Sequence, residues 1–133
     1  MTGMSDIHAI LFNAHILYSL ALGVWAAVSA ARNESISGNF WGAVATYSIL
    51  AAIITIIGVI LTAQGLRPGP EDNKRLTLYL LYMAFLVVIM PGLFSMLRGR
   101  DDRSAGIAFA LLAFFNASVS VSMVDRMVTG PWT

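Results

Sequence analysis

The chain has 133 residues, of which 58% are hydrophobic and only 11% are charged. This composition leaves too little polar surface to cover a water-soluble domain, so it excludes an ordinary soluble protein and predicts a membrane protein. The formal net charge is +1 and the basic residues do not cluster, so no nucleic-acid-binding surface is indicated. Because the sequence has no cysteine, it forms no disulfide and no thiolate metal site.

Four segments are long and apolar enough to cross a bilayer, which requires about 20 residues each. They cover residues 7–31, 40–63, 76–97 and 104–124 approximately. The connectors between them combine charges with Gly, Pro, Asn or Ser, which favour turns, and they are short enough to make successive helices antiparallel neighbours. The sequence therefore predicts an all-α fold: one membrane domain over residues 1–133, with four transmembrane helices in an up-down-up-down bundle.

The first segment carries three polar side chains, His8, Asn13 and His15, in the run DIHAILFNAHILYSLALGVW. Four spans place both termini on one membrane face, the termini side, and Asn13 and Asn116 both lie roughly 9 to 12 Å from it at 1.5 Å per residue. A buried amide needs a partner, and such interhelical bonds contribute about 0.6 to 2 kcal/mol. We expect polar contacts between helices among Asn13, His15 and Asn116, while His8 reaches the interface.

Two interpretations of His15 remain open. A neutral His15 can bond to Asn116, to Ser19 or to a backbone carbonyl, which makes it structural. Alternatively it binds a cofactor, although His8 and His15 lie about 10 Å apart on one helix face and cannot both ligate one haem iron. A haem would need His15 with a methionine or a second copy of the chain, whereas a chlorophyll-type pigment needs His15 alone. His15 is therefore the candidate cofactor-binding residue.

Pairs of small residues recur at four-residue spacing along the helices. Close backbone approach supplies much of the adhesion between helices in lipid, so such pairs mark helix contacts. They are more numerous than four helices obviously require, which favours neighbouring subunits. The pairs are Ala26 and Ala30, Ser48 and Ala52, Gly58 and Thr62, Gly106 and Ala110, Ala113 and Ala117, and Ser118 and Ser122.

The third segment contains Pro91 and Gly92. Proline removes a backbone hydrogen bond and glycine loosens the turn, so a helix kink is expected there. The kink either opens room for a quinone or lipid tail or only adjusts the packing.

The orientation of the chain is only weakly encoded. Lys and Arg residues divide four against four between the two sides, which is also compatible with dual topology. No Lys or Arg precedes the first segment and Arg32 follows it, which favours termini outside. Trp25 and Trp41 mark the opposite edge of the membrane and Trp132 the termini side, with Tyr79 and Tyr82 entering the third helix.

The sequence lacks the residues that several classes of function require. No segment has Asp, Glu, Lys or Arg near its centre, which disfavours proton-coupled transport and ion conduction. The chain contains no catalytic set, phosphate-binding loop or metal motif, and Asp101-Asp102 between two arginines is typical of a solvated turn. We therefore expect no catalytic residues and no metal site, so that the chain is not an enzyme by itself.

The stretches GNFWGAVATYSIL and MPGLFSMLRGRDDRSAGIAF resemble segments of uncharacterised small four-helix bacterial integral membrane proteins. The resemblance covers most of the chain and rests on interfacial aromatic residues and an arginine-rich turn. It implies the four-helix fold and a place among possible accessory subunits of membrane complexes, and it implies no activity.

Together these patterns predict a non-catalytic accessory subunit of a multi-subunit membrane complex. The expected complex is one of respiratory or photosynthetic electron transfer in the bacterial cytoplasmic membrane. The expected partners of the chain are other membrane subunits and lipids, and no resident cofactor is required. One alternative is a haem- or pigment-binding protein that uses His15. Another is a small transporter or lipid-binding protein with a cavity between the first, third and fourth helices, where a quinone or lipid could lie.

Overall fold

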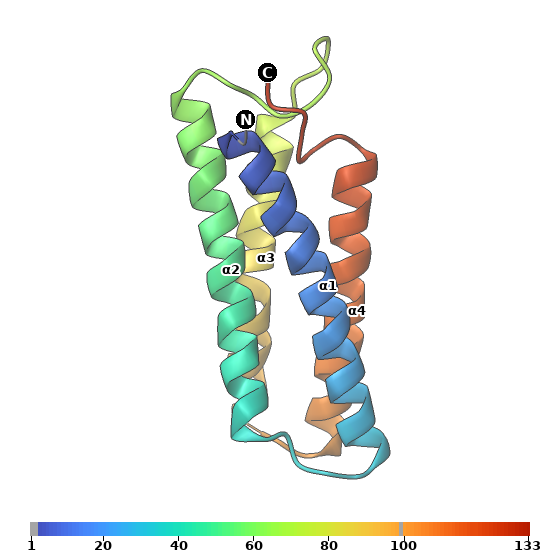
Figure 1. The fold of residues 1–133 in the computed structure, drawn as a ribbon. Coiled ribbons are helices and arrows are strands. Elements are labelled where there is room, and N and C mark those ends of the chain that lie inside the picture. Colours follow the sequence, from blue (N-terminus) through green and yellow to red (C-terminus); the bar gives the residue numbers. More distant parts are fainter. Residues whose placement is uncertain (1–2, 99) are drawn as a thin grey trace.

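A computed structural model describes residues 3–98 and 100–133. Its helices lie along the long axis of the molecule (Figure 1). They are α1 (Met4–Ala31), α2 (Gly38–Ala63), α3 (Leu76–Met96) and α4 (Arg103–Asp125). All four are long and apolar enough to cross a membrane, and no strand occurs in the described part of the chain. The predicted all-α fold with four candidate spans is confirmed, although α1 begins at Met4 rather than near residue 7.

Polar groups fix where three of the helices begin. Ser37 precedes α2, and its hydroxyl accepts a hydrogen bond of 3.2 Å from the amide three residues later. The Asp102 carboxylate does the same for α4 at 3.0 Å, and the Gly3 amide before α1 donates to the Asp6 carboxylate at 3.3 Å. These bonds satisfy groups that have no partner within the helix itself, so the chain turns into each helix at a defined residue.

Each helix buries one stripe of residues that advances in steps of three and four. Such a spacing averages about 3.5 residues, the period of helices that pack as a left-handed bundle. The outward faces are largely apolar as well, so hydrophobicity alone does not distinguish the interior from them. The stripe of α1 comprises His8, Phe12, His15, Ser19, Leu22, Ala26 and Ala30, and that of α3 comprises Tyr79, Met83, Leu86 and Met90.

The helices form a ring in which α1 lies between α2 and α4, with α3 diagonally opposite α1 (Figure 1). The α1–α4 contact is the closest, because small residues face each other: a Cβ at Gly106 would lie 3.5 Å from the Cβ of Ala30. Helix α3 packs along α2 and touches α4 much less. The seam between α3 and α4 is therefore the most open of the four.

Helix α3 continues without interruption through Pro91, which is exposed on the outer surface. A Cβ at Gly92 would meet no atom within 4 Å, so no neighbouring group requires glycine there. The Pro91-Gly92 pair thus leaves the helix intact, and a bend of its axis stays a prediction.

Loops close both ends of the bundle. At the termini side the C-terminal tail runs beside the α2–α3 connector, where Arg67 and Thr133 exchange two backbone hydrogen bonds of 3.0 and 3.1 Å (Figure 1). The Gly69 amide donates to the Pro131 carbonyl at 3.1 Å in the same region. At the opposite end the Ile36 amide donates to the Asp101 carbonyl at 2.8 Å, which joins the other two connectors.

Candidate functional site

The polar groups buried inside the bundle form two histidine–tyrosine pairs at different depths. Nearer the termini side, His8 Nε2 lies 2.6 Å from the Tyr79 hydroxyl, which in turn lies 3.3 Å from the Ile54 carbonyl. Both contacts are hydrogen bonds when His8 Nε2–H donates to the tyrosine oxygen and the tyrosine O–H donates to the carbonyl. His8 is fully buried. The expectation that it reaches the interface is therefore wrong.

Trp132 of the C-terminal tail explains why His8 is covered. Its ring centroid lies 5.4 Å from that of His8 and 5.1 Å from that of Tyr79, both in edge-on arrangements. The indole N–H donates to the Thr129 carbonyl at 3.1 Å, which satisfies its only donor. Trp132 is thus a lid over the first pair. Both Trp132 and Tyr79 are buried at the termini side of the bundle, and their position at a membrane interface stays a prediction.

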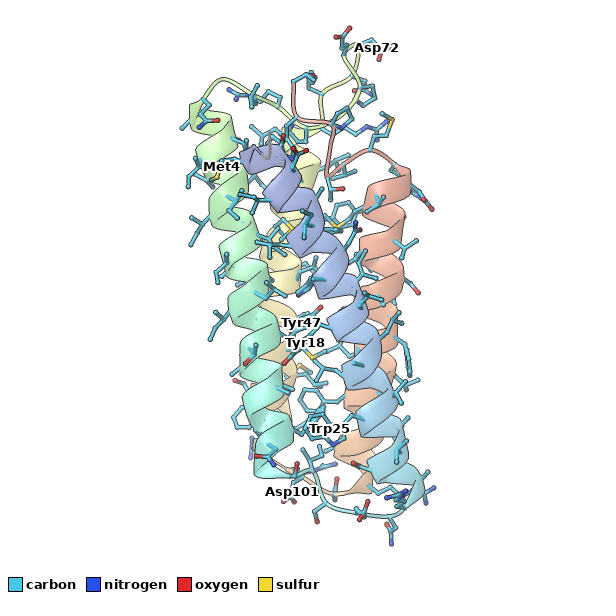
Figure 2. All side chains as sticks on the ribbon, viewed as in Figure 1. Met4, Tyr18, Trp25, Tyr47, Asp72 and Asp101 are labelled. Atoms are coloured by element: carbon cyan, nitrogen blue, oxygen red, sulfur yellow. The ribbon has the colours of Figure 1, made fainter. Side chains whose placement is uncertain are left out.

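The second pair lies deeper, where His15 packs against Tyr47 of α2, and Figure 2 shows Tyr47 about midway along the bundle. The ring centroids are 4.2 Å apart, and His15 Nε2 donates to the backbone carbonyl of Tyr47 at 3.2 Å. A backbone carbonyl is one of the three partners expected for a structural His15. Nearby, the Tyr18 hydroxyl donates to the Ala43 carbonyl at 2.8 Å and adds a second tie between α1 and α2.

Around the Tyr47 hydroxyl several buried polar atoms lack hydrogen bonds. Ser19 and Asn116 are the polar side chains beside it, and the Ser19 hydroxyl donates instead to the Ala113 carbonyl at 2.7 Å. The Tyr47 hydroxyl and the Asn116 amide lie close enough to interact, but neither forms a hydrogen bond of normal geometry within residues 3–98 and 100–133. Buried groups of this kind cost about 1 to 3 kcal/mol each when unpaired, so the centre of the bundle is polar without being fully bonded.

The structure does not bring Asn13 and Asn116 together, which corrects the predicted contact. Asn116 is fully buried, whereas Asn13 is exposed and borders a groove of about 280 Å³ with Thr129. The reason is the register of α1 on α4. Since Ser19 bonds to Ala113, Asn116 lies level with about residue 16, nearly one turn of about 5.4 Å from Asn13. Of the three predicted residues, His15 makes an interhelical hydrogen bond to α2, and Asn116 lies beside the Tyr47 hydroxyl of the same helix.

The surroundings of His15 do not fit a haem or pigment. An axial ligand needs a free ring nitrogen that opens on a space as wide as a macrocycle. Here Nδ1 has no hydrogen-bond partner in the described chain, but the Tyr47 ring packs against the imidazole and His15 has no exposed surface, so no such space opens beside that nitrogen. The larger grooves of the molecule open on the outer surface and are not lined by His15. The geometry thus favours the structural interpretation of this residue.

Two grooves on the outer surface remain as candidate binding sites. The larger, of about 540 Å³, lies between α1 and α4 and is lined in part by Ile16, Leu20, Phe114, Ser118, Val121 and Ser122. We call it the α1–α4 groove. The second, of about 370 Å³, lies in the open seam and is lined by Leu78, Leu81, Tyr82, Phe85, Phe115 and Val119. We call it the α3–α4 groove.

Sequence reasoning missed Tyr47, Tyr79 and Trp132, which supply most of the contacts to the two histidines. The signal for the tyrosines was present, because each stands in a stripe with steps of three and four residues. No comparable signal places Trp132, since its position depends on the tail folding back onto the α2–α3 connector.

Comparisons with known proteins add no relative: no protein-family model, no curated protein and no solved structure matches the chain. The assignment of a function therefore depends on the geometry of the chain itself.

Proposed function

We propose that this chain is a non-catalytic subunit that binds a transmembrane helix of another protein in a larger membrane complex. The observation that carries the proposal is the α1–α4 groove, where Ser118 is exposed and Ser122, one turn further, is half-buried. Most other small-residue pairs are used within the bundle, as Ala26, Ala30 and Gly106 illustrate. Ser118 and Ser122 form the pair that faces outward.

The groove has the properties that helix association in lipid requires. Small residues allow two backbones to approach closely, and serine hydroxyls form hydrogen bonds across helices that contribute about 0.6 to 2 kcal/mol. Leu20, Phe114 and Val121 stand beside the serines and offer apolar walls for a partner's side chains. A single helix is the occupant that combines both kinds of contact along the length of the groove.

The buried polar pairs inside the bundle also support a structural, non-catalytic role. The two histidine–tyrosine pairs join different helices, and neither histidine opens on one of the two larger grooves. Their hydrogen bonds fix the bundle as a rigid block whose outer surface can serve as a docking face. As the class of complex we propose respiratory or photosynthetic electron transfer, with the cofactors carried by the partner subunits.

The test is gentle detergent extraction followed by native mass spectrometry of the wild type and of Ser118→Leu. We expect the wild type to carry at least one other membrane subunit and Ser118→Leu to lose it, because leucine fills the groove. Ala45→Leu is the matched control, since Ala45 is an exposed small residue on α2. Recovery of only monomers or homodimers from wild-type membranes would refute the proposal.

For location we propose the bacterial cytoplasmic membrane with both termini outside. The support is the charge difference across α1, which has no Lys or Arg before it and Arg32 after it. The chain has no cysteine, so single cysteines introduced at Asp72 and Asp101 report the two sides without background. Labelling of intact cells by an impermeant maleimide is expected at position 72 and not at position 101.

A further inference from the structure

A basic pocket lies at the base of the α2–α3 connector, directly above the membrane end of α3. Arg67, Lys74 and Arg75 line this pocket of about 350 Å³, together with the first residues of α3 down to Leu78. Its position is fixed by the fold of the connector, because the Arg75 amide donates to the Pro68 carbonyl at 2.9 Å. Three cationic side chains are thus collected on one side of a short, closed loop.

The charge of this pocket is not balanced by carboxylates. Within residues 3–98 and 100–133 none of the three cations forms a salt bridge, and the ion pair present, between Arg100 and Asp102, lies at the other end of the bundle. The acidic side chain of Asp72 lies at the outer tip of the connector, away from the helices (Figure 2). The pocket therefore presents net positive charge toward the membrane surface.

The donors of the three cations are only partly used. Arg67 donates from one guanidinium nitrogen to the carbonyls of Thr62 and Leu66 at 2.9 and 2.8 Å. Lys74 donates to the Gly69 carbonyl at 3.3 Å and to the Thr133 hydroxyl. Arg75 Nε is buried and has no hydrogen-bond partner in the described chain. Because Nε is buried, an anion from outside would bind the outer guanidinium nitrogens of Arg75, which is only half-buried as a residue.

An apolar groove continues from this pocket into the membrane. Leu78 lines both the basic pocket and the α3–α4 groove, so the two spaces adjoin at that residue. From Leu78 to Phe85 the α3–α4 groove extends about 10 Å along the helix at 1.5 Å per residue. A further groove, lined by Ile89, Leu93 and Leu111 among others, shares Phe115 with it and carries the apolar track toward the opposite side.

From this juxtaposition we infer that the chain has a specific site for an anionic phospholipid, with the phosphate in the basic pocket and one acyl chain in the α3–α4 groove. Arginine and lysine donate to phosphate oxygens, and basic pockets beside transmembrane helices bind lipid headgroups in this way. A zwitterionic lipid would bring a second positive charge to a pocket that has no carboxylate to receive it. A free phosphate would leave the adjoining apolar groove without a role.

This site is independent of the proposed function, because it lies on the α3–α4 seam and the partner helix lies in the α1–α4 groove. Loss of lipid binding with retention of the partner subunit, or the reverse, separates the two. Lipid titrations monitored by native mass spectrometry use the full-length chain in detergent, with phosphatidylglycerol and phosphatidylcholine of identical acyl chains as probes. We expect the wild type to bind phosphatidylglycerol at least ten-fold more tightly.

Two pairs of variants test the two halves of the site. Arg75→Gln should weaken phosphatidylglycerol binding about five-fold, the effect of one cation at a membrane surface, whereas Arg103→Gln, an exposed cation at the far end, should leave it unchanged. Leu78→Trp should block the junction and reduce binding of both lipids, whereas Leu80→Trp, which alters an exposed leucine on the opposite face of α3, should not. Each variant is first compared with the wild type by circular dichroism and thermal unfolding.

Three results would overturn the inference. Equal affinity for the two lipids would remove the charge recognition. If Arg75→Gln folds and keeps the wild-type preference for phosphatidylglycerol, the basic pocket is not the phosphate site. If that variant does not fold, unchanged lipid binding by Leu78→Trp would refute the inference instead. Displacement of phosphatidylglycerol by inorganic phosphate at equal concentration would show a simple anion site without a lipid chain.

Discussion

His8 of α1 and Tyr79 of α3 are joined by a 2.6 Å contact between the imidazole Nε2 and the phenol oxygen, across the diagonal of the bundle. The backbones of these two helices do not come close to each other, because α1 and α3 lie diagonally opposite in the bundle. The pair therefore links elements that backbone packing leaves apart. Because both side chains are fully buried, the bond forms in a medium where an unpaired partner is costly.

Tyr79→Phe should destabilise the bundle by about 1 to 3 kcal/mol, because it leaves His8 Nε2 buried without its partner. The measurement is the free energy of unfolding in detergent micelles. Tyr82→Phe on the same helix is the control, since Tyr82 is only half-buried and lines the outer groove. Equal losses for the two variants would show that the diagonal bond contributes nothing.

Gly58→Ala should lower the free energy of unfolding about as much as the loss of the His8–Tyr79 hydrogen bond. A Cβ at Gly58 would overlap the ring and hydroxyl of Tyr79, and overpacking of this kind costs about 1 to 3 kcal/mol. Gly42→Ala on the same helix meets no atom within 4 Å and should instead be neutral or stabilise by up to about 1 kcal/mol. Thermal unfolding of both variants checks the contrast. An unchanged Gly58→Ala protein would contradict the position of Tyr79.

Trp132→Ala should open the cover over His8 without unfolding the bundle. In the wild type both histidines are buried and should react slowly with diethyl pyrocarbonate, as followed by mass spectrometry. In the variant we expect faster modification of His8 and unchanged modification of His15. Trp25→Ala, which alters an exposed tryptophan at the opposite end, should change neither rate. Rapid modification of His8 in the wild type would exclude the lid.

Asn116→Ala should change the free energy of unfolding by less than about 0.5 kcal/mol, because removing an unpaired buried amide offsets the small cavity that it leaves. Ser19→Ala, by contrast, loses the hydrogen bond to Ala113 and should cost about 1 kcal/mol. Denaturant titration of both proteins gives the comparison. A larger loss for Asn116→Ala than for Ser19→Ala would mean that the amide forms a hydrogen bond inside the bundle, with Tyr47 as the nearby candidate.

The sequence was sufficient for the four helices, since length and hydropathy alone decide which segments span a bilayer. It left two interpretations of His15 open, and a backbone carbonyl was one of the partners expected for the structural one. The Asn13–Asn116 contact failed because depth was counted from helix ends, and α1 begins at Met4, so an error of a few residues moves a side chain by one turn. The stripe through Phe12, His15 and Ser19 would have excluded Asn13, which is one residue off that face.

Contacts that depend on loops could not be predicted. The position of Trp132 follows from backbone hydrogen bonds between the tail and the connector near Arg67. No local sequence pattern in either segment predicts these bonds. The basic pocket has the same origin, because Arg67 and Lys74 are separated along the chain and converge only when Gly69 turns the connector back. Gly69 has a φ of +111°, in the region that favours glycine.

The central claim, that a partner helix lies in the α1–α4 groove, is tested most directly by photocrosslinking in intact membranes. A photoreactive amino acid at position 118 faces the groove, and one at position 45 on α2 faces lipid away from it. We expect position 118 to give a single crosslinked product with another membrane protein and position 45 to give none. Crosslinking of position 118 to lipid alone, or to a second copy of this chain alone, would contradict the claim.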